Sequence, residues 1–160
     1  MRRIVLCCAA LMLALAATSG GQEAAVPKHV IAKPADLKWG NPPPVFEKGA
    51  LFTVVSGNPG VAGPYVVRLK MPAGYKIAPH WHPTDENVTV ISGTFSVGMG
   101  EKVDKATMTD LPAGGFVLLP AEMKHYAMAK TAAIVQVHGM GPFQLTYVNP
   151  ADDPSTRAAK

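Results

Sequence analysis

Short runs of β-branched and aromatic residues, separated by clusters of Gly, Pro, Ser and Asn, dominate the chain from residue 51 onward. Such runs predict β-strands, and the clusters between them predict turns. Many short strands in succession are typical of a sandwich or a closed barrel, which removes exposed sheet edges. The strands are expected at residues 51–55, 65–71, 88–91, 94–99, 116–119, 132–138 and 143–148.

Two flanking segments lack this pattern. Residues 20–49 are rich in Pro, Ala and Lys and include three consecutive prolines at 42–44, which indicates an extended arm with one short edge strand at most. Residues 150–160 are polar and are expected to form a loose tail. Because the chain has 160 residues, is 48% hydrophobic and shows no internal repeat, the sequence predicts one domain, at residues 50–149.

The first nineteen residues have the pattern of a secretory signal peptide. Arg2 and Arg3 precede an apolar run over residues 4–17, and small residues follow at the expected cleavage region. The alternative is a membrane anchor, but fourteen apolar residues fall short of the roughly 20 that a spanning helix needs. We therefore expect export to the periplasm or the medium, with no stable membrane anchor after cleavage.

Export would change the composition of the mature protein. Both cysteines, Cys7 and Cys8, lie within the signal peptide, so no disulfide or thiolate ligand would remain after cleavage. Loss of Arg2 and Arg3 would leave 13 basic side chains against 11 acidic ones, which lowers the formal charge from +4 to +2. This balance, without a basic stripe of interleaved aromatics, argues against nucleic acid as a partner.

A cluster of metal-binding residue types follows the third predicted turn. His80 and His82 are two residues apart, so both point to one side of a strand, and the carboxylate of Glu86 follows a short turn. His125 is a fourth candidate ligand. Imidazole nitrogen and carboxylate oxygen without sulfur favour a divalent transition metal and disfavour a soft cuprous ion.

The spacing of these residues resembles the cupin superfamily. The first cupin motif, G-x5-H-x-H-x3-E-x6-G, is matched from Gly74 through His80, His82 and Glu86 to Gly93. The second motif, G-x5-P-x-G-x2-H-x3-N, is matched at Gly114, Pro120 and His125, but Glu122 stands where Gly is usual and Ala129 where Asn is usual. A Glu at position 122 would be strained if that position requires a positive φ.

The resemblance implies an all-β fold, a cupin-type jelly-roll barrel (double-stranded β-helix) behind the extended arm. It also implies that His80, His82, Glu86 and His125 hold the metal, which in cupins is commonly Fe, Mn, Ni, Zn or Cu, and it makes a homodimer plausible. The motif favours Glu86 over the adjacent Asp85, which is expected to stay in the turn. Trp81 lies between two ligands and is therefore expected on the opposite face of the strand.

Two further residues are candidates for proton transfer. His138 shares a strand face with Gln136, which is either a solvated outer face or the mouth of the pocket. Tyr126 directly follows His125 and either packs in the core or lines a cavity beside the metal.

Three functions are compatible with these residues. The first is a metal-dependent enzyme for a small molecule, either an oxygenase or a Lewis-acid lyase, decarboxylase or isomerase. The second is a non-catalytic cupin that binds or senses a metal or a small ligand. The third is a barrel in which the metal only stabilises the fold, because fold and ligand set recur across unrelated activities.

Overall fold

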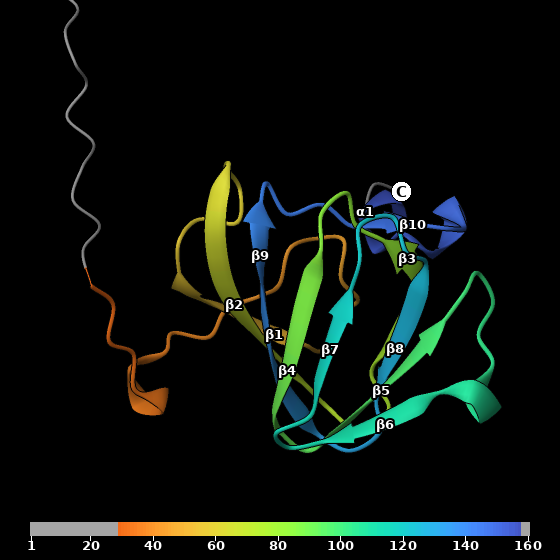
Figure 1. Cartoon of the computed structure of the whole chain (residues 1–160), viewed down its shortest axis with the longest axis horizontal. Helices are drawn as coiled ribbons and strands as arrows, with labels where there is room; N and C mark the ends of the chain where they lie inside the picture. Colours follow the sequence, from red (N-terminus) through yellow and green to blue (C-terminus); the bar gives the residue numbers. More distant parts are fainter. Residues whose placement is uncertain (1–28, 158–160) are drawn as a thin grey trace, which may run out of the picture.

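The computed structural model describes residues 29–157, in which ten strands form two five-stranded antiparallel sheets (Figure 1). The two sheets form the two sides of a barrel, and most neighbours within a sheet are distant in sequence. The first sheet has the order β1 (Leu51–Ser56), β2 (Gly63–Met71), β9 (Ala133–Gly141), β4 (Glu86–Ser92), β7 (Phe116–Leu119). The second has the order β10 (Thr146–Tyr147), β3 (Lys76–Trp81), β8 (His125–Ala129), β5 (Thr94–Met99), β6 (Thr109–Pro112).

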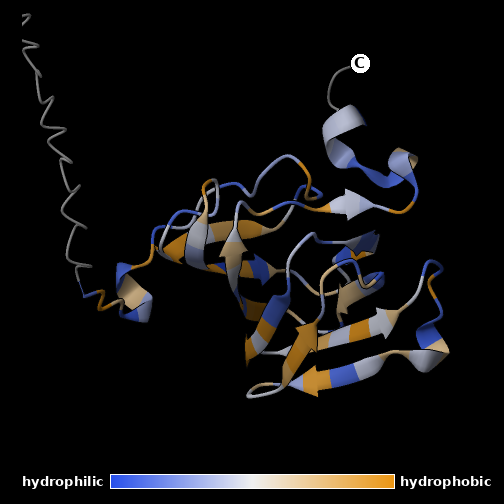
Figure 2. Ribbon diagram, turned by 45° about the horizontal axis from the view of Figure 1, so that its top comes forward, coloured by the Kyte–Doolittle hydropathy of each residue, from blue (hydrophilic) through white to orange (hydrophobic). Residues whose placement is uncertain are grey.

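Alternation along the strands places apolar residues inside the barrel. Figure 2 shows hydrophobic and hydrophilic bands alternating on the strands. From the first sheet the buried inward residues include Val67, Leu69, Val88, Val90, Val135 and Val137, and from the second they include Phe95, Val97, Ala127 and Ala129. This core confirms the predicted all-β jelly roll, because period-two patterns bury one face of each sheet.

The strand predictions differ from the structure in four places. Strand β3 was expected only as the strand that carries His80 and His82, and His82 lies just past its end. Strands β6 and β8 were not among the expected runs, since their sequences, Thr-Asp-Leu-Pro and His-Tyr-Ala-Met-Ala, contain few β-branched residues. Both form because they pair with β5, and β8 also pairs with β3. The run expected at residues 143–148 forms only the two-residue strand β10. Tertiary pairing thus overrides weak local propensity.

The N-terminal arm packs against the barrel. It contains the 3-10 helix η1 (Pro34–Asp36) and a single bridge between Gly40 and Phe52, and it inserts Phe46 into the core. Tyr147 donates its hydroxyl to the Val45 carbonyl at 2.7 Å. The expected signal peptide at residues 1–19 lies outside the described residues.

The tail is ordered where it is described, which corrects the expectation of a loose segment. It forms the 3-10 helix η3 (Pro150–Asp152) and the short helix α1 (Pro154–Arg157). The Asp153 carboxylate caps this turn by accepting hydrogen bonds from Ser155, and Arg157 forms an ion pair with Glu47 of the arm. A further 3-10 helix, η2 (Lys105–Thr107), lies in the loop that connects β5 to β6.

Candidate metal centre

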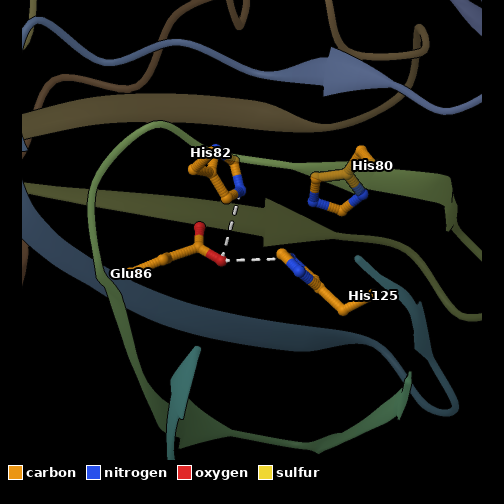
Figure 3. Close-up of side chains that lie close together, drawn as sticks. All are labelled: His80, His82, Glu86 and His125. Carbon is orange, nitrogen blue, oxygen red and sulfur yellow. Dashed lines mark ion pairs between the residues drawn. The ribbon is translucent and has the colours of Figure 1, made fainter. Parts of the chain in front are cut away.

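Four side chains from three strands and one turn meet inside the barrel (Figure 3). His80 lies near the end of β3, His82 directly follows that strand, Glu86 begins β4, and His125 begins β8 opposite His80. One ligand-type atom of each residue lies within 4.8 Å of the others. The three histidines are at most 5% exposed. The structure therefore brings together all four residues that the sequence predicted as metal ligands.

Each imidazole ring is held by a backbone carbonyl. The Nδ1 atoms of His80, His82 and His125 lie 2.7, 2.6 and 2.9 Å from the carbonyl oxygens of Ala78, Gln144 and Met123, respectively. A carbonyl only accepts, so each Nδ1 carries the hydrogen of a neutral ring and each Nε2 is left with a free lone pair. This pattern orients metal-binding histidines in proteins.

Two of these Nε2 atoms have no hydrogen-bond partner within the described chain. They belong to His82 and His125, and both are fully buried. They lie 3.4 and 3.5 Å from the same carboxylate oxygen, Oε2 of Glu86. Buried polar atoms are almost always paired, so two unpartnered nitrogens that face one carboxylate fit a site that would hold a cation.

The pKa shifts of Glu86, His80 and His82 are compatible with a bound cation. Burial by itself would raise the pKa of Glu86, but contacts with His125 and His82 outweigh it and hold that pKa well below its usual range. Burial, followed by repulsion from His125 and His82, lowers the pKa of His80 to about 3. Burial opposes protonation of His82 as well, but Glu86 outweighs it and raises the His82 pKa. The site thus combines a charged carboxylate with three imidazoles, which are the ligand types that a divalent cation requires.

The donor set fits the expected class of metal. Three imidazole nitrogens and one carboxylate oxygen are suitable ligands for Fe, Mn, Ni, Zn or Cu(II). His80, His82, Glu86 and His125 would hold the ion, and six-coordinate geometry would leave about two positions for other ligands.

The two motif segments are joined by two hydrogen bonds near the cluster. The Asp85 carboxylate accepts from the Ala121 N–H at 2.8 Å, and the Glu122 N–H donates to the His82 carbonyl at 2.8 Å. Asp85 thus stays in the turn, as predicted. Glu122 has a φ of 63° and is the one non-glycine residue with positive φ among residues 29–157, so the expected strain is present.

The cluster forms one wall of an otherwise apolar cavity. Its only polar lining residues are the ligand candidates His80, Glu86 and His125, and the rest is lined by Val, Leu, Ile, Phe, Met, Ala and Pro side chains. The cavity has a volume of about 40 Å³, which is enough for about three water molecules. Any substrate in this state must therefore be small.

Neither proton-transfer candidate is brought to the cluster. Tyr126 lies on the face of β8 opposite His125, and its hydroxyl accepts from the Asp104 N–H at 2.9 Å and donates to the Asp104 carbonyl at 3.0 Å. His138 lies on the outer face of β9, because its neighbour Val137 faces the cavity. Trp81 likewise alternates with the ligands, as expected.

Tyr65 lies near Glu86 but was not among the predicted site residues. Its ring lies on the inward face of β2 with Val67 and Leu69, and it is 3% exposed. Burial, followed by the negative charge of Glu86, raises the pKa of Tyr65 to about 12. The alternation Tyr65, Val67, Leu69 was a visible signal for an inward position, but only the pairing of the strands brings Tyr65 near Glu86.

Barrel and ligand cluster together define a cupin with a three-histidine, one-glutamate centre. The sequence matches the model of the ChrR cupin-like domain over residues 27–144, and the chain belongs to this family. No curated protein matches it.

Solved structures support the same fold. The polyketide cyclase RemF from Streptomyces resistomycificus is 13% identical, with a TM-score of 0.66 over 83% of this chain and 94% of the cyclase. A putative acetylacetone dioxygenase from Methylibium petroleiphilum is 20% identical, with a TM-score of 0.63 over 85% of this chain and 96% of that protein. A salicylate 1,2-dioxygenase from Pseudoaminobacter salicylatoxidans is 14% identical, with a TM-score of 0.54 over 67% of this chain and 31% of that chain. At these identities the likeness establishes the fold alone.

Proposed function

We propose that this cupin is a metal-dependent enzyme that acts on a small, uncharged molecule. The observation that carries the proposal is the convergence of three carbonyl-oriented imidazoles and one charged carboxylate on the wall of an apolar cavity. A bound cation would supply Lewis-acid activation of a substrate oxygen, or redox chemistry with O₂ if the metal is redox-active. An oxygenase or a Lewis-acid lyase, decarboxylase or isomerase is therefore the reaction class.

The residues that line the cavity restrict the charge of a possible substrate. No Lys or Arg side chain lines it, so a substrate carboxylate would have the metal as its only cationic partner. The apolar walls instead favour a neutral molecule that presents one or two oxygen atoms. The structural neighbours include proteins named as a cyclase and as dioxygenases, which supports catalysis as a proposal for this fold but not the choice of a neutral substrate.

Metal analysis and an activity screen test this proposal. The protein is purified without chelators, its metals are quantified, and apo protein is reloaded with Fe(II), Mn(II), Ni(II), Zn(II) or Cu(II). Each form is then incubated with neutral diketones, phenols and catechols, and with keto acids for comparison, while oxygen uptake and products are measured. Turnover that requires one metal and prefers neutral compounds supports the proposal. Stoichiometric metal without turnover in any form contradicts catalysis.

A non-catalytic binding protein is the second candidate. It is favoured by the small volume of the cavity and by the lack of any acid or base among its lining residues besides the ligand candidates. Such a protein would be stabilised by a ligand in thermal melts, yet would leave that ligand unchanged. The same screen, followed by melting of each mixture, separates the two functions.

We also propose that the protein is exported. The support is the sequence pattern of Arg2, Arg3 and the apolar run that follows. Within residues 29–157 the structure contains no helix with the length and hydrophobicity required to span a membrane. N-terminal sequencing of periplasmic or secreted protein should begin between Ala17 and Glu23, and intact Met1 in the membrane fraction would contradict this.

A further inference from the structure

The segment between β9 and β10 lies beside the four-residue cluster. The Gln144 carbonyl oxygen is 2.6 Å from Nδ1 of His82, and the centroid of the Phe143 ring is 5.4 Å from that of the His82 ring. Side chains alternate along this segment, so Phe143 and Leu145 are half-buried against the core while Gln144 is exposed. The same short segment thus orients one ligand candidate and places an aromatic ring beside it.

Phe143 also lies between the inner cavity and the surface. The cavity of about 40 Å³ beside the cluster and a surface hollow of about 510 Å³ share four lining residues, which are Phe52, Pro59, Phe143 and Leu145. The two spaces therefore lie on opposite sides of one layer of side chains. Of these four residues, Phe143 is the one whose ring lies next to a histidine of the cluster.

This layer is easier to open than a paired sheet. Phe143 and Leu145 lie outside the strands, and the Phe143 N–H donates to the Pro59 carbonyl oxygen at 2.6 Å. By contrast, a second surface hollow, of about 400 Å³, meets the cavity at Ile77 and Ala127, which pair across β3 and β8. Opening the wall there would break sheet hydrogen bonds, whereas the Phe143 ring can move by side-chain rotation with its backbone in place.

Aromatic packing favours the observed position of the Phe143 ring. Phe46 from the N-terminal arm stacks on it, with centroids 6.1 Å apart and an interplanar angle of 10°. Tyr65 from β2 meets it edge to face, also at 6.1 Å. Both are preferred geometries of aromatic pairs. Contacts from the arm and from the barrel therefore keep the ring between the two spaces.

We propose that Phe143 sets the size of the molecules that reach the four-residue cluster: its ring closes the route from the surface hollow, and a smaller side chain would join the two spaces. This inference rests on the proposed function, because it concerns access to a metal-dependent site. It explains how a cavity with room for about three water molecules lies close to a large hollow and yet is separate from it.

Acylation by diethyl pyrocarbonate tests the inference on metal-free protein. The reagent is far bulkier than water, and it transfers an ethoxycarbonyl group to an unprotonated imidazole nitrogen with release of ethanol and carbon dioxide. Tandem mass spectrometry of peptides from chelator-treated protein gives the modification rates of His80, His82 and His125, with the exposed His29 as internal reference. Relative to His29, the three cluster histidines should react roughly tenfold faster in Phe143→Ala than in the parent protein, and Phe143→Leu should be intermediate.

Phe95→Ala is the matched control. Phe95 lines the same cavity but not the surface hollow, and it is 4% exposed. Its loss should lower the melting temperature at least as much as loss of the half-buried Phe143, because it leaves a space inside the core. Since the route from the surface stays closed, the cluster histidines should react at the parent rate.

Three results would overturn the inference. One is an unchanged acylation rate in both Phe143→Ala and Phe143→Leu. Another is an equal acceleration in Phe95→Ala, which would assign the effect to lost stability. The third is a parent protein whose cluster histidines already react as fast as His29. Because the test uses metal-free protein, the proposed function fails separately, if the parent protein takes up no metal.

Discussion

The two motif segments build the same site in different ways. Residues 74–93 supply three of the four candidate ligands within one strand end, one turn and one strand start. Residues 114–129 supply only His125, which reaches the cluster because β8 pairs with β3 and sets His125 opposite His80. Three ligands are thus placed by local geometry and the fourth by sheet pairing, so the fourth depends on the whole barrel.

The segments also differ in backbone strain. Gly74, Gly93 and Gly114 occupy positive φ without a side chain, as the turns require. Glu122 occupies the same region with a Cβ, and its N–H supports the His82 carbonyl. The second segment therefore has a strained backbone at Glu122, the residue whose N–H donates to the carbonyl of His82 in the first segment.

The largest expected effect follows loss of a ligand from the first segment. His82→Ala should reduce metal binding by at least 100-fold, because it removes a lone-pair donor and leaves the Glu86 carboxylate with one fewer partner. Metal content after dialysis and competition with a chelator measure this.

His138→Ala is the matched control, since it removes a histidine from the outer face of β9. It should retain the full metal content of the parent protein. Equal metal affinity in His82→Ala and His138→Ala would show that the four-residue cluster is not the metal site.

Acid should destabilise the metal-free protein through His80. Its pKa falls from 6.5 to about 3 on folding, so the unfolded chain binds the proton more tightly, and stability present above pH 6.5 is lost as the pH falls toward 3. Between pH 7 and pH 5 this contribution is on the order of 2 kcal/mol. Urea unfolding of chelator-treated protein at both pH values measures it.

His80→Gln removes that contribution, because it replaces the His80 ring and leaves the other three ligand candidates in place. Its stability should fall less between pH 7 and pH 5 than that of the parent protein. The same drop in both proteins would assign the acid sensitivity to another group.

Removing the link between the segments should have a moderate effect. Asp85→Ala deletes the acceptor for the Ala121 N–H and should lower the free energy of unfolding by about 1 kcal/mol, with weaker metal binding. Asp85→Asn keeps a side-chain oxygen in place and should recover most of both losses. If Asp85→Asn is as damaging as Asp85→Ala, the hydrogen bond is not the cause.

The smallest effect is expected from relief of strain. Glu122→Gly should raise the free energy of unfolding by about 0.5–1 kcal/mol, because Gly adopts the observed φ of 63° without a Cβ penalty. Ala121→Gly, at the neighbouring exposed position, provides the control and should be neutral or destabilising. A loss of stability in Glu122→Gly would show that the Glu side chain stabilises the turn.

Much of the barrel could be predicted from local pattern. Strands such as β2 and β9 alternate apolar with polar residues over part of their length, and that period-two signal depends only on neighbouring residues. The spacing of His80, His82 and Glu86 is equally local. By contrast, β8 carries little propensity of its own and forms because strands on both sides pair with it.

The sequence by itself determined the all-β class, the ligand candidates and their chemical preference, because alternation and donor type are properties of short segments. Only the tertiary structure decided which other side chains face the cluster. Tyr126 and His138 were candidates by proximity in sequence, yet each lies on the strand face that points away from the cavity. Tyr65 was brought near Glu86 by the pairing of β2, β9 and β4. Register between strands far apart in the chain is set by burial of the whole sheet, which no local pattern encodes.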